Sequence, residues 1–358
     1  MSNRASALSL LSDAISRRRL LGAGLAGAVA WQLPVFPASA MGHGSRLFSL
    51  GVASGDPGPD SVVLWTRLGP APLHGGGMEP RPVLVHWEVA LDPQMRQVVR
   101  RGSVIARPEA GHTVHALAEG LAADRWYYYR FSVGAEDSPV GRTRTFPERG
   151  ALPQRMRFAL VSCQDFQNGY YSAYRSLAEE DIDFVVHVGD YIYEDPPRPL
   201  APRQVPDGET MTLADYRRRY ALYRMDPALQ AVHAAFPFIT TFDDHEVDNN
   251  YAGNTPEDAE DPAAFRQRRA GAYQAYFEHM PLRERARPDG NAIQLFRRLR
   301  FGRLAELHVL DTRQFRTDQP CGDGIKPACA QVFDPAATMT GTAQEEWLLR
   351  GLDASQAI

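Results

Sequence analysis

The sequence predicts a two-domain chain, with an all-β domain over residues 45–147 and an α/β domain over residues 155–358. Two patterns lead to this prediction. Short runs of β-branched and aromatic residues, separated by Gly, Pro and Asp, fill the first segment. The second segment alternates short apolar runs with stretches of helical spacing. A chain of 358 residues is also longer than one hydrophobic core usually organises, which favours two domains.

The composition excludes several classes of protein. With 44% hydrophobic and 23% charged residues, the chain is typical of a globular protein rather than a disordered one. The formal net charge is −4, so nothing indicates the broad electropositive surface that nucleic-acid binding requires. We therefore expect no specific nucleic-acid partner.

The first forty residues carry the pattern of a targeting segment. Arginines occupy positions 17–19, directly before an apolar stretch over residues 20–35, and Ala-Ser-Ala at 38–40 matches a signal-peptidase site. Twin arginines before a weakly hydrophobic, Gly/Ala-rich stretch resemble a Tat signal. The stretch is interrupted by polar and proline residues and is shorter than the roughly twenty residues of a membrane span. We expect residues 1–40 to be a Tat-type signal that engages the Tat export machinery. The protein would then reach the periplasm, the cell envelope or the medium without a stable membrane anchor.

The first domain reads as a β-sandwich of the fibronectin or immunoglobulin type. Its strand-like runs are short and bounded by turn residues, and its tryptophans suit buried positions. No catalytic side chains gather in it, so we expect a structural or positioning role. The runs that carry this prediction are 61–66, 83–89 and 126–133.

A short polar linker over residues 147–153 precedes the α/β domain. Thr212 and Asp215 have the spacing of a capping box, and a helix that starts there is expected to break near Pro227. Alternating strands and helices indicate helices packed over a sheet. The predicted strands are 157–162, 183–190, 238–242 and 304–310, and the predicted helices are 170–180 and 212–236.

Three polar motifs fall just past the ends of predicted strands, where open α/β sheets bind their ligands. They are Ser162–Asp165, Gly189–Glu194 and Phe242–Asn250. The last motif places four carboxylates within six residues, beside His245. At a strand end these carboxylates would repel one another and have raised pKa values unless a cation neutralised them. The alternative is an acidic loop left in solvent, where screening weakens the repulsion.

The second motif favours the metal interpretation. Gly189 permits a sharp turn after an apolar strand, and Asp190 would then present oxygen ligands for a hard cation at the edge of the sheet. His187 and His308 lie inside predicted strands, and we expect them to be interior histidines rather than metal ligands.

The chain has three cysteines. Cys321 and Cys329 lie eight residues apart in a Gly/Pro-rich segment, so an oxidising compartment could join them. Cys163 is then without a partner, and it is either buried in a core or used as a ligand.

Gly189-Asp190 followed by Asp244-His245-Glu246 resembles the metallophosphoesterase (calcineurin-like) pattern, in which GD precedes GNHE, with aspartate in place of the usual asparagine. Longer segments resemble the PhoD-type alkaline phosphatases. The resemblance runs from about residue 47 to the end and implies a calcineurin-like α/β sandwich preceded by a fibronectin-type β-sandwich. The segments that carry it are 51–57, 63–67, 161–164, 187–194, 243–250 and 310–316.

The resemblance implies a site with one Fe(III) and two Ca(II) ions. Cys163, Asp190 and Tyr193 match the iron ligands, with Asp190 also bridging to calcium. The chemistry agrees, because thiolate and phenolate suit iron and carboxylates suit calcium. The alternatives are that Cys163 is a buried structural thiol and that Tyr193 is an ordinary tyrosine beside a strand.

The third motif supplies further site residues by the same resemblance. Asp244 occupies the position of the superfamily's metal-binding asparagine, with Asp243 as the alternative. His245 matches the catalytic histidine that stabilises the phosphoryl group or the leaving oxygen. Asn249 or Asn250 would offer an amide oxygen to calcium, and the sequence does not choose between them.

The implied function is metal-dependent hydrolysis of phosphate monoesters, and of diesters, by a metal-bound hydroxide or oxo nucleophile. Substrates would be phosphate-ester small molecules or polymers, with Arg313 and Arg316 as possible phosphate contacts. One alternative is a phospholipase-D-like phosphodiesterase on the same scaffold. Another is an exported binding protein with a vestigial site.

The resemblance also implies a catalytic domain that continues beyond residue 358. Residues 342–352 resemble the helix before a further core strand, and a late histidine and acidic pair near a GD-x-H motif would follow. We therefore expect the chain to hold the first half of the site, and to be unstable, metal-poor or inactive by itself.

Overall fold

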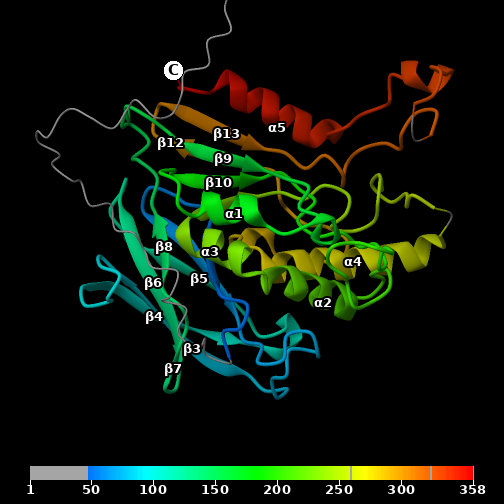
Figure 1. The fold of residues 1–358 in the computed structure, drawn as a ribbon. Coiled ribbons are helices and arrows are strands. Elements are labelled where there is room, and N and C mark those ends of the chain that lie inside the picture. The colour runs from blue at the N-terminus through cyan, green and yellow to red at the C-terminus, as the bar shows by residue number, and fades with distance from the viewer. Residues whose placement is uncertain (1–46, 259, 323–324, 358) are drawn as a thin grey trace, which may run out of the picture. The chain divides into compact units, whose positions relative to one another are not determined.

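The computed structural model describes residues 47–258, 260–322 and 325–357. The signal predicted at residues 1–40 lies outside this range. Residues His43–Ile358 form one compact unit, and the fold below is that of this unit (Figure 1).

A six-stranded mixed sheet runs through the unit in the order β5-β2-β1-β11-β10-β9. Strands β1, β11, β10 and β9 are mutually parallel, and β2 and β5 continue the sheet in antiparallel fashion. The strands are β1 (Val52–Gly55), β2 (Ser61–Arg67), β5 (Thr113–Glu119), β9 (Phe158–Val161), β10 (Phe184–His187) and β11 (Pro237–Thr240).

A five-stranded antiparallel sheet forms the rest of the β-rich region, in the order β4-β3-β6-β7 with β8 also paired to β6. Buried side chains of this sheet and of β1, β2 and β5 share one hydrophobic cluster, including Val62, Val85 and Phe131. The strands are β3 (Val83–Ala90), β4 (Val98–Ala106), β6 (Trp126–Val133), β7 (Glu136–Asp137) and β8 (Gly141–Arg144).

The two predicted domains share a sheet, because β1 pairs with β11 through Ser54 beside Pro237 and Gly55 beside Phe238. The sequence analysis did not anticipate this pairing, which joins segments far apart in the chain. The predicted strands at 61–66, 83–89 and 126–133 are confirmed as β2, β3 and β6. The domain boundaries and the fibronectin-type arrangement stay predictions.

The α-helices are α1 (Ser172–Leu177), α2 (Leu213–Arg224), α3 (Pro227–Ala235), α4 (Pro262–His279) and α5 (Gly341–Asp353). The predicted break is confirmed, because α2 ends before Pro227 and α3 begins with it, capped by Asp226. The predicted capping box of Thr212 and Asp215 is also confirmed. Short 3-10 helices are Pro108–Ala110, Phe166–Asn168, Glu284–Ala286 and Ala330–Phe333. Helix α4 was not expected, because buried arginines interrupt its apolar face.

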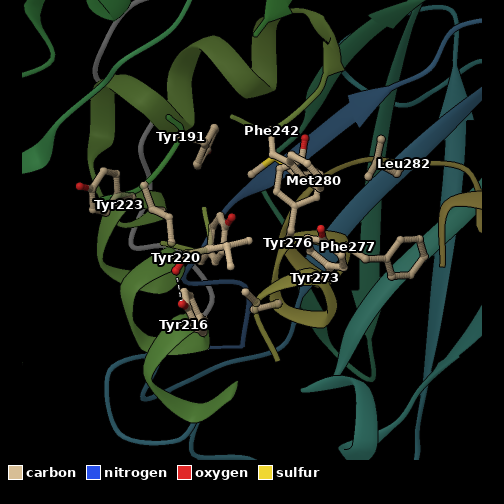
Figure 2. Close-up of a cluster of buried hydrophobic side chains, with 14 of the residues drawn as sticks. Tyr191, Tyr216, Tyr220, Tyr223, Phe242, Tyr273, Tyr276, Phe277, Met280 and Leu282 are labelled. Carbon is tan, nitrogen blue, oxygen red and sulfur yellow. Dashed lines mark hydrogen bonds between the residues drawn. The ribbon is translucent and has the colours of Figure 1, made fainter. Parts of the chain in front are cut away.

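The core between the helices and the sheet is rich in tyrosine, as Figure 2 shows for α2, α4 and their surroundings. These phenols connect the core to the loops that follow the strands. The Tyr223 hydroxyl accepts the backbone N–H groups of Phe166 (3.2 Å) and Tyr193 (3.1 Å). The Tyr216 hydroxyl donates to the carbonyl of Val247. Buried phenols usually find such partners, and for Tyr216 and Tyr223 the partners are loop backbones.

The other face of the six-stranded sheet packs against the hairpin of β12 (Arg297–Phe301) and β13 (Ala305–Val309). Phe184 and Ile239 of the sheet contact Leu299 and Phe301 of this hairpin in a separate cluster. Helix α5 packs beyond the hairpin through Trp347 (Figure 1). In the part of the chain that the structure describes, no helix is both long and apolar enough to cross a membrane.

Candidate metal centre

Three loops meet at the carboxyl ends of β9, β10 and β11. Because these strands are parallel neighbours, the residues that follow them reach the same edge of the sheet. Backbone hydrogen bonds join two of the loops, from Cys163 N to Gly189 O (3.2 Å) and from Gln164 N to Asp190 O (3.1 Å). The edge position predicted for the three motifs is therefore confirmed.

The turn after β10 requires glycine at position 189. Gly189 has φ of 114°, and a Cβ there would lie 2.4 Å from the backbone nitrogen of Asp243. Neighbouring residues are also held in the left-handed region, with φ of 52° at Cys163, 54° at Asp190 and 54° at Asn250. Non-glycine residues rarely adopt this conformation, and such strain concentrates at functional sites.

Asp190, Asp244 and His245 form a cluster whose potential ligand atoms all lie within 4.8 Å of one another. Asp190 Oδ2 accepts the Tyr193 hydroxyl at 3.1 Å, whereas Oδ1 is buried without a hydrogen-bond partner. Burial, and then the charge of Asp244, raise the pKa of Asp190. A buried, unpaired carboxylate oxygen beside a second carboxylate is a costly arrangement that a bound cation would relieve.

Asp244 is the one carboxylate of its motif in this cluster. Burial alone would raise its pKa, but the Asn250 N–H (2.8 Å) and the Arg313 guanidinium (3.3 Å) hold it below its usual value. Asp243 is half-exposed and accepts Arg313 Nε at 2.6 Å. Asp248 pairs with Arg268 at 3.0 Å.

Glu246, the fourth carboxylate, is fully buried and ties two loops together. It accepts the backbone N–H of Tyr191 (2.6 Å) and that of Asp243 (2.9 Å). Burial, followed by the charge of Asp190, raises its pKa to about 8. Since Asp244, Glu246 and Asp248 are all buried, the alternative of a solvated acidic loop is wrong.

His245 is held by a residue that the sequence analysis left without a role. Its Nδ1 lies 2.8 Å from the buried Glu194 carboxylate, and its ring packs on Tyr193 with 4.1 Å between centroids. Burial favours the neutral ring, but Glu194, Asp244 and Asp190 together raise the pKa of His245 to about 9.

Cys163 and Tyr193 border the cluster. Cys163 is exposed, so the alternative of a buried structural thiol is wrong. Partial burial and the nearby Asp190 raise the pKa values of both the Cys163 thiol and the Tyr193 phenol. A cation would reverse these shifts, because both groups bind metals as anions. The donor set of thiol, phenol, carboxylates and imidazole therefore fits a metal site.

Two family models match this chain. The family model described as PhoD-like phosphatase matches residues 158–358, and that of the PhoD-like phosphatase N-terminal domain matches residues 36–147. The chain belongs to the PhoD-like phosphatase family. Alkaline phosphatase D of Bacillus subtilis (strain 168) is 51% identical over 315 residues, which cover 87% of this chain and 54% of that protein.

A solved structure, described as the structure of PhoD, also resembles this member of the PhoD-like family. The TM-score is 0.86 at 51% sequence identity, and the match covers 87% of this chain and 61% of the solved one. The chain thus spans about half the length of the curated relative that it matches.

Other residues predicted for this PhoD-like site have different surroundings. The side-chain amides of Asn249 and Asn250 both donate to Glu257, at 2.5 and 3.4 Å. Arg313 pairs with Asp243 and Asp244. Arg316 is half-buried nearby, and burial and the charge of Arg313 lower its pKa. Whether these residues bind metal or phosphate stays a prediction.

The two histidines set aside in the sequence analysis are interior residues. His187 is buried, its Nε2 lies 3.3 Å from Gln164 Oε1, and burial lowers its pKa to about 3. His308 is mostly buried and lies 3.0 Å from Glu306. The predicted disulfide between Cys321 and Cys329 is confirmed.

Sequence reasoning missed Glu194 and Gln164. Gln164 donates to the carbonyl of Tyr191 (2.7 Å) and accepts the hydroxyl of Tyr174 (2.5 Å), so it joins the first two loops. Gln164 lies within the Ser162–Asp165 motif and Glu194 within the Gly189–Glu194 motif, so these motifs could have pointed to both residues. Their partners, however, come from other loops and helices, and only the fold brings them together.

Proposed function

We propose that the chain carries a metal-dependent site for the hydrolysis of phosphate esters. The observation that carries this proposal is the buried, unpaired Oδ1 of Asp190 beside Asp244 and His245. Such a cluster suits a cation, and cations neutralise the charge of phosphate groups. The likeness to alkaline phosphatase D supports the same activity.

We infer that the metals are Fe(III) and Ca(II). Cys163, Tyr193 and Asp190 would hold iron, and Asp190 and Asp244 would hold calcium, because thiolate and phenolate favour iron whereas carboxylate oxygens favour calcium. When bound, these ions supply Lewis-acid stabilisation of the phosphate charge and activate a water molecule for attack.

The chain's own residues orient the substrate and stabilise its charge. Glu194 accepts Nδ1–H of His245, so the other ring nitrogen is available to donate to a phosphoryl or leaving-group oxygen. The buried Glu194 carboxylate raises the pKa of His245 and so favours the protonated ring, whose charge would attract the phosphate. Arg313 holds Asp243 and Asp244 in place and adds a second positive charge at this edge.

Metal content tests the proposal directly. Elemental analysis of the purified chain, incubated with an excess of iron and calcium, is expected to show bound metal, although less than a complete site would hold. D190N should lose both metals, C163S should lose mainly iron, and D244N should lose calcium. The matched control is D137N, an exposed aspartate paired with Arg130, which should retain wild-type metal content. Equal metal content in D190N and in the wild type would contradict the proposal.

Turnover separates the candidate activities. The ratio of p-nitrophenyl phosphate to bis-p-nitrophenyl phosphate hydrolysis distinguishes a monoesterase from a diesterase. Bound metal without turnover of either compound favours a binding protein with a vestigial site. We further propose export through the Tat pathway. Residues 1–40 fused to a folded reporter should direct its export, and replacement of Arg17, Arg18 and Arg19 by lysine should abolish it.

A further inference from the structure

A polar cavity elsewhere in the described chain shares no lining residue with the candidate metal centre. Its volume is about 440 Å³. It is lined by residues 56–61, which connect β1 to the start of β2, by Arg149, Arg283 and Arg285, and by residues 298–300 of β12. Five of the lining side chains are arginines and two are aspartates, so the cavity carries an excess of positive charge.

Asp56, the buried carboxylate of the cavity lining, is already neutralised. Asp56 and Arg297 form an ion pair at 2.7 Å, and both side chains are almost fully buried, at 2% and 3% exposure. Asp60, at the rim, is exposed and accepts the Ser61 hydroxyl. Arg298 and Arg300 are likewise matched, because both pair with Glu306.

Three arginines are left without a carboxylate partner among the residues described. Arg283 is anchored by neutral groups, since its guanidinium donates to the Asp56 carbonyl (2.9 Å) and to the Ser61 hydroxyl (3.1 Å). Arg149 and Arg285 have exposed side chains with no ion pair among the described residues. Partial desolvation in the cavity lining lowers the pKa of Arg285. The charge of Asp56 opposes this shift, and the charges of Arg297 and Arg283 add to it. The arginines therefore repel one another in the absence of an anion.

We propose that this arginine pocket binds a phosphate-class oxyanion at a site separate from the metal centre. Guanidinium groups match the tetrahedral oxygens of phosphate and form paired hydrogen bonds with them. Arg283 is preorganised by its contacts with the Asp56 carbonyl and the Ser61 hydroxyl. Arg285 lies two residues further along the same segment, and Arg149 belongs to the segment after β8. The occupant is either inorganic phosphate or a phosphoryl group of a longer chain. The inference does not depend on hydrolysis or on bound metal.

Calorimetric titration with inorganic phosphate, in chelator-treated protein, tests this inference. Phosphate should bind the wild type, and R149Q/R285Q should weaken the affinity at least about tenfold, which corresponds to about 1.4 kcal/mol. The matched control is R101Q/R107Q, which removes the same charge from two exposed arginines outside the pocket. It should bind as the wild type does, and so should D190N/D244N.

Two results would overturn the inference. One is unchanged affinity in R149Q/R285Q, and the other is loss of phosphate binding in D190N/D244N alone, which would assign the anion to the metal centre. Circular dichroism verifies the fold of each variant, and R149K/R285K restores charge without the planar fork, so partial recovery of affinity is expected.

Titration with tripolyphosphate distinguishes the two sources of the anion. Much tighter binding than that of phosphate, lost in R149Q/R285Q, identifies a chain of phosphoryl groups. Similar affinities for both compounds identify an isolated phosphate. Either outcome supports the pocket, and failure of the metal proposal would leave both readouts unchanged.

Discussion

The carboxylate of Glu194 lies 2.8 Å from Nδ1 of His245, although the two residues are 51 positions apart in the chain. Glu194 follows β10 and His245 follows β11, so the pair forms where these two strands end side by side. The same carboxylate accepts the backbone N–H of Asn249 at 2.7 Å. A single buried side chain thus fixes both the ring of His245 and the loop that carries it.

Replacement of Glu194 by glutamine should lower the pKa of His245. Burial alone favours the neutral ring, and Glu194 is the largest of the contributions that raise its pKa to about 9. In metal-free E194Q, the pKa of His245 should therefore fall toward 6.5 while the fold is retained. Titration of the imidazole signals by nuclear magnetic resonance measures this shift. An unchanged His245 titration in E194Q would show that the pair does not control the charge of the ring, and D137N serves as the control.

Alanine at position 189 should destabilise the protein and disturb the site. The added Cβ would lie 2.4 Å from Asp243 N, at a φ of 114° that alanine rarely adopts. Strain of this kind costs about 1–3 kcal/mol, which urea denaturation measures. At Gly150 a Cβ meets nothing within 4 Å and φ is not positive. G150A should therefore lie within about 0.5 kcal/mol of the wild type, and equal stability of the two variants would contradict the packing argument.

Two tyrosines of α2 offer a matched pair. The Tyr223 hydroxyl accepts two backbone N–H groups of the site loops, whereas the Tyr220 hydroxyl is buried without a hydrogen-bond partner. Y223F should cost about 1–3 kcal/mol, because it leaves two donors unsatisfied. Y220F should be neutral or stabilising, since it removes an unsatisfied group. Chemical denaturation compares the two, and a larger loss in Y220F would refute this account of the core.

Stability should fall as the pH is lowered from about 6.5 to about 4, in part because of His115. Burial is the main cause that lowers the pKa of His115 to about 4, and its ring stacks on Phe277 and contacts the carbonyl of Met280. Between these pH values the unfolded chain binds a proton that the folded chain does not. Stability therefore rises with pH across this window.

The size of this effect is on the order of 3 kcal/mol, since each unit of pKa difference is worth about 1.36 kcal/mol. H115Q should reduce the acid-induced loss by a comparable amount, measured by denaturation at pH 7 and at pH 4.5. H74Q, at an exposed histidine, should behave as the wild type. The same acid-induced loss in H115Q and in the wild type would assign it to other groups.

Thiol titration should find one reactive cysteine in the native protein and three after reduction in denaturant. Cys321 and Cys329 form a disulfide, and Cys163 is free and exposed. C163S should leave no reactive thiol until the disulfide is reduced. Bound iron should protect Cys163 from the reagent, because a ligating thiolate is not available for reaction. Three reactive thiols in the native, oxidised protein would contradict the disulfide.

The local elements were largely predictable, because their signals lie within a few residues. The capping box at Thr212, the break at Pro227 and the three polar motifs after β9, β10 and β11 depend on neighbouring residues only. Helix α4 was missed, since its inward face includes Arg268 and Arg269, which a hydrophobic pattern does not count. Arg268 pairs with Asp248 and Arg269 donates to the carbonyl of Gly253, and both partners lie in the loop before α4.

Local sequence patterns were enough to show which residues stand at the strand ends and which chemistry they offer. They identified Asp190 and His245 as site residues, and the family resemblance favoured Asp244, with Asp243 as the alternative, among the four carboxylates beside His245. The fold brings Asp244 together with Asp190 and His245, and it alone revealed that Asp243 pairs with Arg313 and Asp248 with Arg268. It also decided that β1 joins the sheet of β11. The physical reason is the same in each case. A carboxylate's role depends on the charge and burial that surround it, and strand pairing depends on contacts between distant segments, so neither is encoded in local spacing.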